Sequence, residues 1–184
     1  MSQSAPSIRS EAATGFAVLA ALLLTGNCTD ALGPEDVHPQ PDAPFQTSSL
    51  QYTLADNGSE HHIIVSTTYV NRSATTVYEG WCTRVLEKKT GKSWTVAFAP
   101  SCPTVGVAPN AYTPGTPYQV DFSVAGAYVP NTYPRFLIEP IPGVYRFRIG
   151  LYARAIPTST GLPTLTDPLS VAERVSNEFW LGLP

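Results

Sequence analysis

Eighteen prolines are spread along the whole length of this 184-residue chain. Proline lacks a backbone donor and its ring clashes with the preceding helical turn, so this distribution disfavours long α-helices. Charged residues make up only 14% of the sequence, against roughly 25% in an average soluble protein. Good helix formers such as Lys and Glu are therefore scarce. The composition predicts an all-β protein.

Three segments alternate apolar and polar residues with the two-residue period of a half-buried strand: 61–71, 118–124 and 144–153. In the last segment the aromatic and aliphatic set is expected in the core, and Arg146 and Arg148 in water. Shorter segments bring the expected number to seven or eight strands. Turn signals separate them about every ten residues, which indicates an antiparallel β-sandwich.

Other segments are expected to connect these strands. Residues 75–86 and 94–99 should form two arms around a charged hairpin tip at 88–92. Residues 100–117 and 157–168 contain several prolines and are expected to be long loops.

Two short motifs add a family resemblance. An apolar strand ends in Val70-Asn71, and residues 142–146 (Pro-Gly-Val-Tyr-Arg) open a late strand. With these motifs, the segment from Leu50 to Leu181 resembles exported immunoglobulin-like modules. The resemblance implies an antiparallel immunoglobulin-like sandwich. It implies no activity, because one fold carries many functions.

The N-terminus carries a ten-residue apolar run, 15–24, shortly before Cys28. A membrane-spanning helix needs about 20 apolar residues, so this run is too short for a permanent anchor but suits an export signal. Small residues before a cysteine resemble the lipobox of bacterial lipoproteins, with Asn27 where the family has Gly or Ala. The resemblance implies that Cys28 is lipidated and becomes the first mature residue. Cleavage by an ordinary signal peptidase is the alternative.

These features divide the chain into three parts. Residues 1–27 are expected to be the signal peptide, and 28–48 the lipidated cysteine with a proline-rich tether. The β-sandwich domain is expected at 49–184. Packing of the tether as an N-terminal edge strand is the alternative.

The three cysteines agree with this division. If Cys28 carries lipid, Cys82 and Cys102 remain as an even pair, which suits an oxidising compartment. A disulfide between them would close a loop of about 20 residues and stabilise the fold by roughly 3 kcal/mol in the chain-entropy model. A metal or redox pair has less support, because no Cys-x-x-Cys spacing occurs.

The sequence offers little for catalysis or for nucleic acid. A net charge of −3 with scattered Lys and Arg gives no basic patch. There is no Gly-x-Ser-x-Gly turn, no glycine-rich phosphate loop and no assignable carboxylate pair. His61 and His62 are adjacent in a strand, so their side chains should point to opposite faces and are poorly placed to share a metal. We expect no enzyme activity, no cofactor and no metal site.

With the lipobox resemblance, we expect an exported, lipid-anchored protein of the bacterial cell envelope, at the outer membrane or cell surface. Its expected role is non-catalytic binding or structural. Its expected partners are the membrane, through Cys28, and an envelope protein or glycan.

Two more specific alternatives stay open. Trp81, Trp94 and Trp180 could stack on sugars if they lie exposed in a flat row, as in a carbohydrate-binding module. Tryptophans of a small sandwich more often fill its core, so their exposure distinguishes the two cases. A proteinase inhibitor would need a protruding loop at 100–117 or 157–168.

Overall fold

The described residues fold almost entirely as β-strands. The computed structural model describes residues 32–56, 60–80, 82–102, 106–128, 134–140, 142–159 and 161–184. These ranges contain fourteen strands and no α-helix, with two short 3-10 helices, η1 (Pro34–Asp36) and η2 (Val171–Arg174). The all-β prediction is confirmed. There are more strands than the expected seven or eight because several have only two or three residues. Within the described ranges, no helix has the length and apolar character needed to cross a membrane.

The first sheet is built on two long antiparallel strands, β4 (His61–Val70) and β9 (Pro117–Gly126), which pair along their full length. On its other edge, β4 pairs with β1 (Phe45–Thr47) and β3 (Ala55–Asp56). The predicted alternation is confirmed, because one set of side chains on the two long strands is buried: Ile63, Val65, Thr67, Tyr69, Val120, Phe122 and Val124.

The second sheet has six strands. Their order across the sheet is β10 (Arg135–Phe136), β7 (Ser93–Ala99), β6 (Val85–Thr90), β11 (Gly143–Arg148), β14 (Phe179–Gly182) and β2 (Gln51–Thr53). All neighbours are antiparallel except β14 and β2. Strands β6 and β7 form a charged hairpin, but its bounds differ from the expected ones. Residues 88–90 pair within the hairpin instead of forming its tip, and Val77–Glu79, expected in the first arm, is a separate strand in another sheet. Its turn contains Gly91 with φ of +58°, a conformation that glycine adopts without steric cost.

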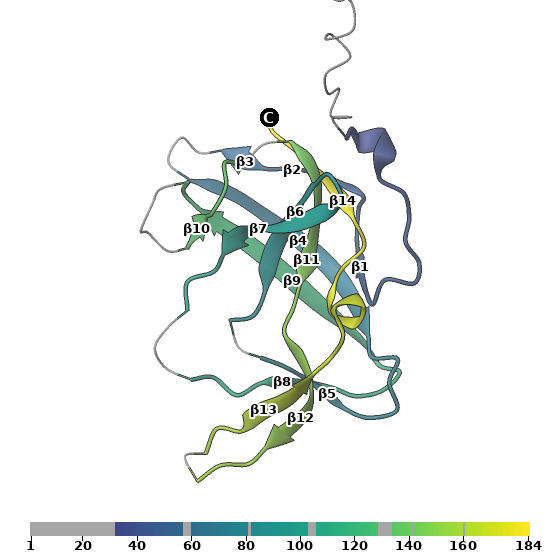
Figure 1. Cartoon of the computed structure of the whole chain (residues 1–184), viewed down its shortest axis with the longest axis vertical. Coiled ribbons are helices and arrows are strands. Elements are labelled where there is room, and N and C mark those ends of the chain that lie inside the picture. The colour runs from purple at the N-terminus through teal and green to yellow at the C-terminus, as the bar shows by residue number, and fades with distance from the viewer. Residues whose placement is uncertain are drawn as a thin grey trace, which may run out of the picture. The chain divides into compact units, whose positions relative to one another are not determined.

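These two sheets pack face to face around the hydrophobic core, as in a β-sandwich (Figure 1). The ring of Phe122 on β9 stacks on the ring of Phe147 on β11, with centroids 3.9 Å apart. Phe147 also stacks on Phe179 of β14 at 5.4 Å. Full burial of each such side chain contributes about 1.5–3 kcal/mol, so these rings hold the two layers together.

A third sheet lies at the lower end of the domain in Figure 1. Its order is β13 (Thr164–Pro168), β12 (Leu151–Ile156), β5 (Val77–Glu79) and β8 (Asn110–Tyr112). The segments 100–117 and 157–168, expected as loops, therefore each contain a strand.

The expected single strand at 144–153 is divided between two sheets, as β11 and β12. At the break, the Gly150 amide donates to Thr83 Oγ1 at 3.0 Å and its carbonyl accepts from the Gly80 amide at 2.8 Å. A Cβ on Gly150 would lie 2.6 Å from Thr83 Cβ, so only glycine fits where these segments meet. The predicted alternation survives the break, since four alternate residues are at most 1% exposed: Tyr145, Phe147, Ile149 and Leu151.

The folded part of the chain begins before residue 49. Phe45 is fully buried, and its ring stacks on Tyr69 with centroids 4.3 Å apart. The Thr47 amide donates to Asn177 Oδ1 at 2.7 Å. The domain boundary therefore moves to residue 45 at the latest, and the alternative of an edge strand holds for 45–47. A strand of three residues is too short to show periodicity among prolines.

Candidate functional site

The outward face of the six-stranded sheet carries two tryptophans at the ends of one cross-strand row. Trp94 on β7 lies opposite Lys89 on β6, and Val144 on β11 lies opposite Trp180 on β14. Lys88 pairs with Tyr145, so the same register carried one residue further places Lys89 beside Val144. We call Trp94, Lys89, Val144 and Trp180 the tryptophan row. It spans three strand spacings, or about 14 Å between the outer Cα atoms.

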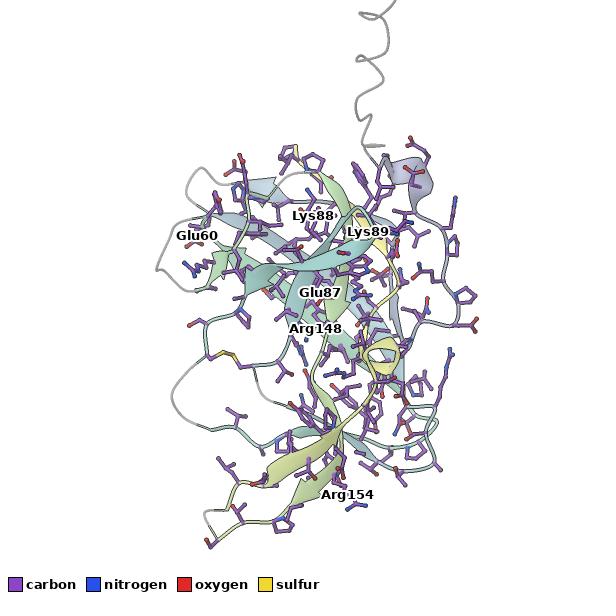
Figure 2. The ribbon with its side chains drawn as sticks, viewed as in Figure 1. Glu60, Glu87, Lys88, Lys89, Arg148 and Arg154 are labelled. Atoms are coloured by element: carbon purple, nitrogen blue, oxygen red, sulfur yellow. A yellow bond between two sulfur atoms is a disulfide. The ribbon has the colours of Figure 1, made fainter. Side chains whose placement is uncertain are left out.

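A second row of side chains lies beside the tryptophan row on the same face. Glu87 on β6 pairs with Arg146 on β11, and the register continues to Glu178 on β14. Glu87 Oε2 accepts from Arg146 Nε at 2.8 Å, and Glu87 Oε1 accepts from Arg148 Nε at 2.6 Å. Glu178 accepts from Lys89 Nζ at 2.9 Å. We call Glu87, Arg146, Arg148 and Glu178 the charged cluster. Figure 2 labels Glu87, Lys89 and Arg148 over this sheet.

Contacts within the charged cluster explain why Arg146 and Arg148 are only partly exposed to solvent. Glu87 is 7% exposed, Arg146 16% and Arg148 30%. Both arginines lie on the outward face, as predicted, but two guanidiniums share one carboxylate and the three side chains cover one another. Their exposure is therefore lower than the alternation alone predicts.

Both tryptophans of the row are half-buried and held in place. The guanidinium of Arg146 lies 4.1 Å from the ring centroid of Trp94, and Lys89 Nζ lies 5.7 Å from it. The indole of Trp180 lies along its own strand, since a Cβ on Gly182 would be 3.4 Å from Trp180 Nε1. Neither tryptophan fills the core, so the condition that would exclude a sugar-binding surface is not met for these two.

A cleft of about 350 Å³ lies on another part of the domain, beside the disulfide. Its floor is formed by core side chains, including Leu86, Phe98 and Phe122, and its wall includes Glu79 and Arg84. Clefts of this size can hold a small molecule. The polar groups in its wall are already bonded to each other.

Glu79 is the centre of that bonding. It is 4% exposed and accepts from Arg84, from Asn110 at 3.0 Å and from Tyr112 Oη at 2.5 Å. Burial alone would raise the pKa of Glu79, but the hydrogen bonds and charge of Arg84, with the hydrogen bonds from Tyr112 and Asn110, outweigh burial and lower it. Burial and the charge of Glu79 raise the pKa of Tyr112. This network is satisfied internally, which indicates a structural role.

The disulfide between Cys82 and Cys102 is present, as predicted, with Cα atoms 5.7 Å apart (Figure 2). It ties the segment after β7 to the segment before β6. Cys82 has φ of +60°, an uncommon conformation for a non-glycine residue. Cys82 and Ser101 both line the cleft, so the bridge shapes its rim.

The other residues singled out in the sequence are placed as follows. Cys28 and Trp81 lie outside the described residues. His61 is half-buried and His62 exposed on β4. In the described ranges, no group of three or more His, Cys, Asp or Glu side chains could hold a metal ion. Two segments were considered as inhibitor loops. Cys102 and β8, in the segment 100–117, are held by the disulfide and by pairing with β5, and the segment 157–168 contains β13, which pairs with β12.

Glu87 and Glu178 are site residues that the sequence did not reveal. Each is an ordinary polar position in its own strand, and its partner lies 59 residues or more away along the chain. Only the strand register brings these carboxylates to the arginines and Lys89. A local motif could not have identified them.

The solved structures that resemble this chain include one distant neighbour. No protein-family model matches the sequence, and no curated protein matches it significantly. The X-ray structure of Northeast Structural Genomics Consortium target SoR45 aligns with 76% of this chain and 82% of its own, at 11% identity and a TM-score of 0.34. At this similarity nothing about family or function follows, so the function must be argued from the site.

Proposed function

We propose that this chain is an exported, lipid-anchored protein of the bacterial cell envelope, and that its immunoglobulin-like sandwich has a non-catalytic role in binding a glycan. The observation that carries the glycan proposal is the tryptophan row. Trp94 and Trp180 are half-buried at the two ends of one cross-strand row on one sheet face, and Val144 between them is 1% exposed.

The physical case rests on geometry and rigidity. Indole faces provide apolar planes for the C–H faces of sugar rings, and an indole N–H can bond a hydroxyl. The adjacent charged cluster offers donors and acceptors that are already fixed by ion pairs, such as Arg146 with Glu87 at 2.8 Å. Fixed side chains lose little entropy when a ligand binds. A row about 14 Å long suits an oligosaccharide better than a single sugar.

Affinity electrophoresis against a panel of soluble neutral and acidic polysaccharides tests the glycan proposal. We expect retardation by at least one polysaccharide, reduced about tenfold or more in affinity by Trp94→Ala and by Trp180→Ala, a loss of roughly 1.4 kcal/mol each. Tyr128→Ala is the matched control, because Tyr128 is 52% exposed and follows β9 of the first sheet, outside this face. Retardation that survives both tryptophan changes, or no retardation by any polysaccharide, would contradict the proposal.

Export and lipidation rest on separate observations. They are supported by the short apolar run before Cys28 and by the Cys82–Cys102 disulfide, since such bridges persist in oxidising compartments. Mass spectrometry of the protein purified from cells tests both. We expect a chain that starts at Cys28, carries an acyl mass on that residue and retains the crosslink. A full-length chain with three free thiols would contradict this part of the proposal.

A further inference from the structure

The guanidiniums of Arg146 and Arg148 share a single carboxylate. Each donates to Glu87 through its Nε atom, at 2.8 and 2.6 Å. In the described part of the chain, the terminal Nη atoms of the two arginines donate no hydrogen bond to a protein group. Both side chains are partly exposed, Arg146 at 16% and Arg148 at 30%. Among the described residues, the Nη donors of both guanidiniums are therefore not used by protein groups.

The local charge is positive on a protein whose overall charge is negative. Glu87 neutralises one of the two arginines, and Glu178 neutralises Lys89 at 2.9 Å. One guanidinium charge is left over. The whole chain has a net charge of −3. This face therefore favours an anionic ligand.

The hydrogen-bond donors of this face indicate which class of anion it would bind. A guanidinium presents parallel N–H groups that match the two oxygens of a carboxylate, which an ammonium group cannot do. Arg146 also covers one face of the Trp94 ring at 4.1 Å, so a sugar that stacks on the other face lies beside the anion-binding group. A sugar that carries a carboxylate on its ring can engage both together.

We propose that Arg146 and Arg148 make this face selective for acidic glycans, with the Nη atoms of the arginines binding the carboxylate of a uronic acid residue. The inference rests on the proposed function, because it assigns the ligand class of the same face. Arg148 is the better residue for a test. It contacts Glu87 but not Trp94, and it is the more exposed of the two.

A pair of polymers with the same backbone tests the selectivity. Polygalacturonate and its fully methyl-esterified form differ in charge while sharing the sugar ring. We expect the domain to bind polygalacturonate at least about tenfold more tightly than the ester at low salt. Arg148→Gln should weaken binding to polygalacturonate about fivefold or more, and so reduce the ratio of the affinities for polygalacturonate and the ester. Arg148→Lys, which keeps the charge, should lose part of the same affinity because the bidentate geometry is lost.

Arg154→Gln is the matched control. Arg154 is 73% exposed, pairs with Asp167 on the third sheet and lies far from the charged cluster in Figure 2. A cooperative thermal unfolding transition shows that a variant is folded. If Arg148→Gln does not fold, Arg148→Lys replaces it in the test.

The outcomes separate the two proposals. Equal binding of both polymers would overturn the selectivity and leave glycan binding intact. The selectivity would also be overturned if Arg148→Gln did not change binding to polygalacturonate. Equally tight binding of dextran sulfate and duplex DNA at equal charge would overturn it as well, because the domain would then attract any polyanion. No binding to any neutral or acidic glycan would overturn the proposed function itself.

Discussion

Arg146 stacks on Trp94 with its guanidinium 4.1 Å from the ring centroid, and the same guanidinium is bound to Glu87 at 2.8 Å. Three neighbouring strands, β7, β11 and β6, thus each supply one member of a single unit. The carboxylate fixes the guanidinium, and the guanidinium fixes the indole. A change to any member should therefore affect the other two.

Glu87→Gln tests this coupling. The side chain is 7% exposed between two arginines, so removing its charge leaves two guanidiniums close together without a counter-ion. We expect a loss of about 3 kcal/mol in the free energy of unfolding, measured by urea denaturation at neutral pH. Arg154→Gln breaks an exposed pair and should change it by less than about 0.5 kcal/mol. Equal effects of the two variants would show that the cluster is not a stabilising unit.

The free energy of unfolding at acidic pH should depend on the ionisation of Glu79. Its pKa is lowered in the folded protein, so the ionised carboxylate adds stability above the ordinary glutamic acid pKa of about 4.3. That stability is lost as the pH falls below about 4.3 and through the lower pKa of the folded state. Glu79→Gln should be less stable than the parent at pH 7, and the difference should shrink as the pH falls. A pH-independent difference between the two would contradict this assignment.

The disulfide should matter for stability. The Cys82–Cys102 bridge closes a loop with a sequence separation of 20, and its removal should cost about 3 kcal/mol by the chain-entropy estimate. The double variant Cys82→Ser, Cys102→Ser should unfold at correspondingly lower urea concentration. Adding a reductant should produce the same shift in the parent and none in the double variant. A parent that is insensitive to full reduction would contradict a stabilising role for the bridge.

Phe45 tests where the folded domain begins. It is fully buried and stacks on Tyr69 at 4.3 Å, so Phe45→Ala should lower the free energy of unfolding by about 3–5 kcal/mol. Tyr128→Ala, at a 52% exposed position, provides the comparison for loss of an aromatic ring from the surface. If 28–48 were entirely a tether, both changes would be neutral.

The long strands were predictable because each shows its own alternation. In β4 and β9 the apolar set is buried where the two-residue period places it, for example at Val65 and Phe122. Alternation cannot show where a strand leaves one sheet for another. The break at Gly150 depends on the close approach of Thr83, which lies 67 residues away in the sequence.

The candidate site was predictable only in part. Trp94 and Trp180 were identified from residue type, and the sequence left open whether they fill the core. Their place in one row follows from the pairing of four strands, which no local pattern encodes. The outward direction of Arg148 was predicted correctly, while its half-burial depends on Glu87 from another strand.

The indole signals of the tryptophans offer the most direct measurement of ligand binding by this face. The chain has three tryptophans, so its ¹H–¹⁵N spectrum should show three indole N–H signals, and Trp94→Phe and Trp180→Phe assign two of them. On titration with an oligosaccharide of a polymer that the domain binds, we expect the Trp94 and Trp180 signals to shift together and to saturate at the same concentration. Saturable binding with both signals unmoved would place the ligand elsewhere and contradict the account.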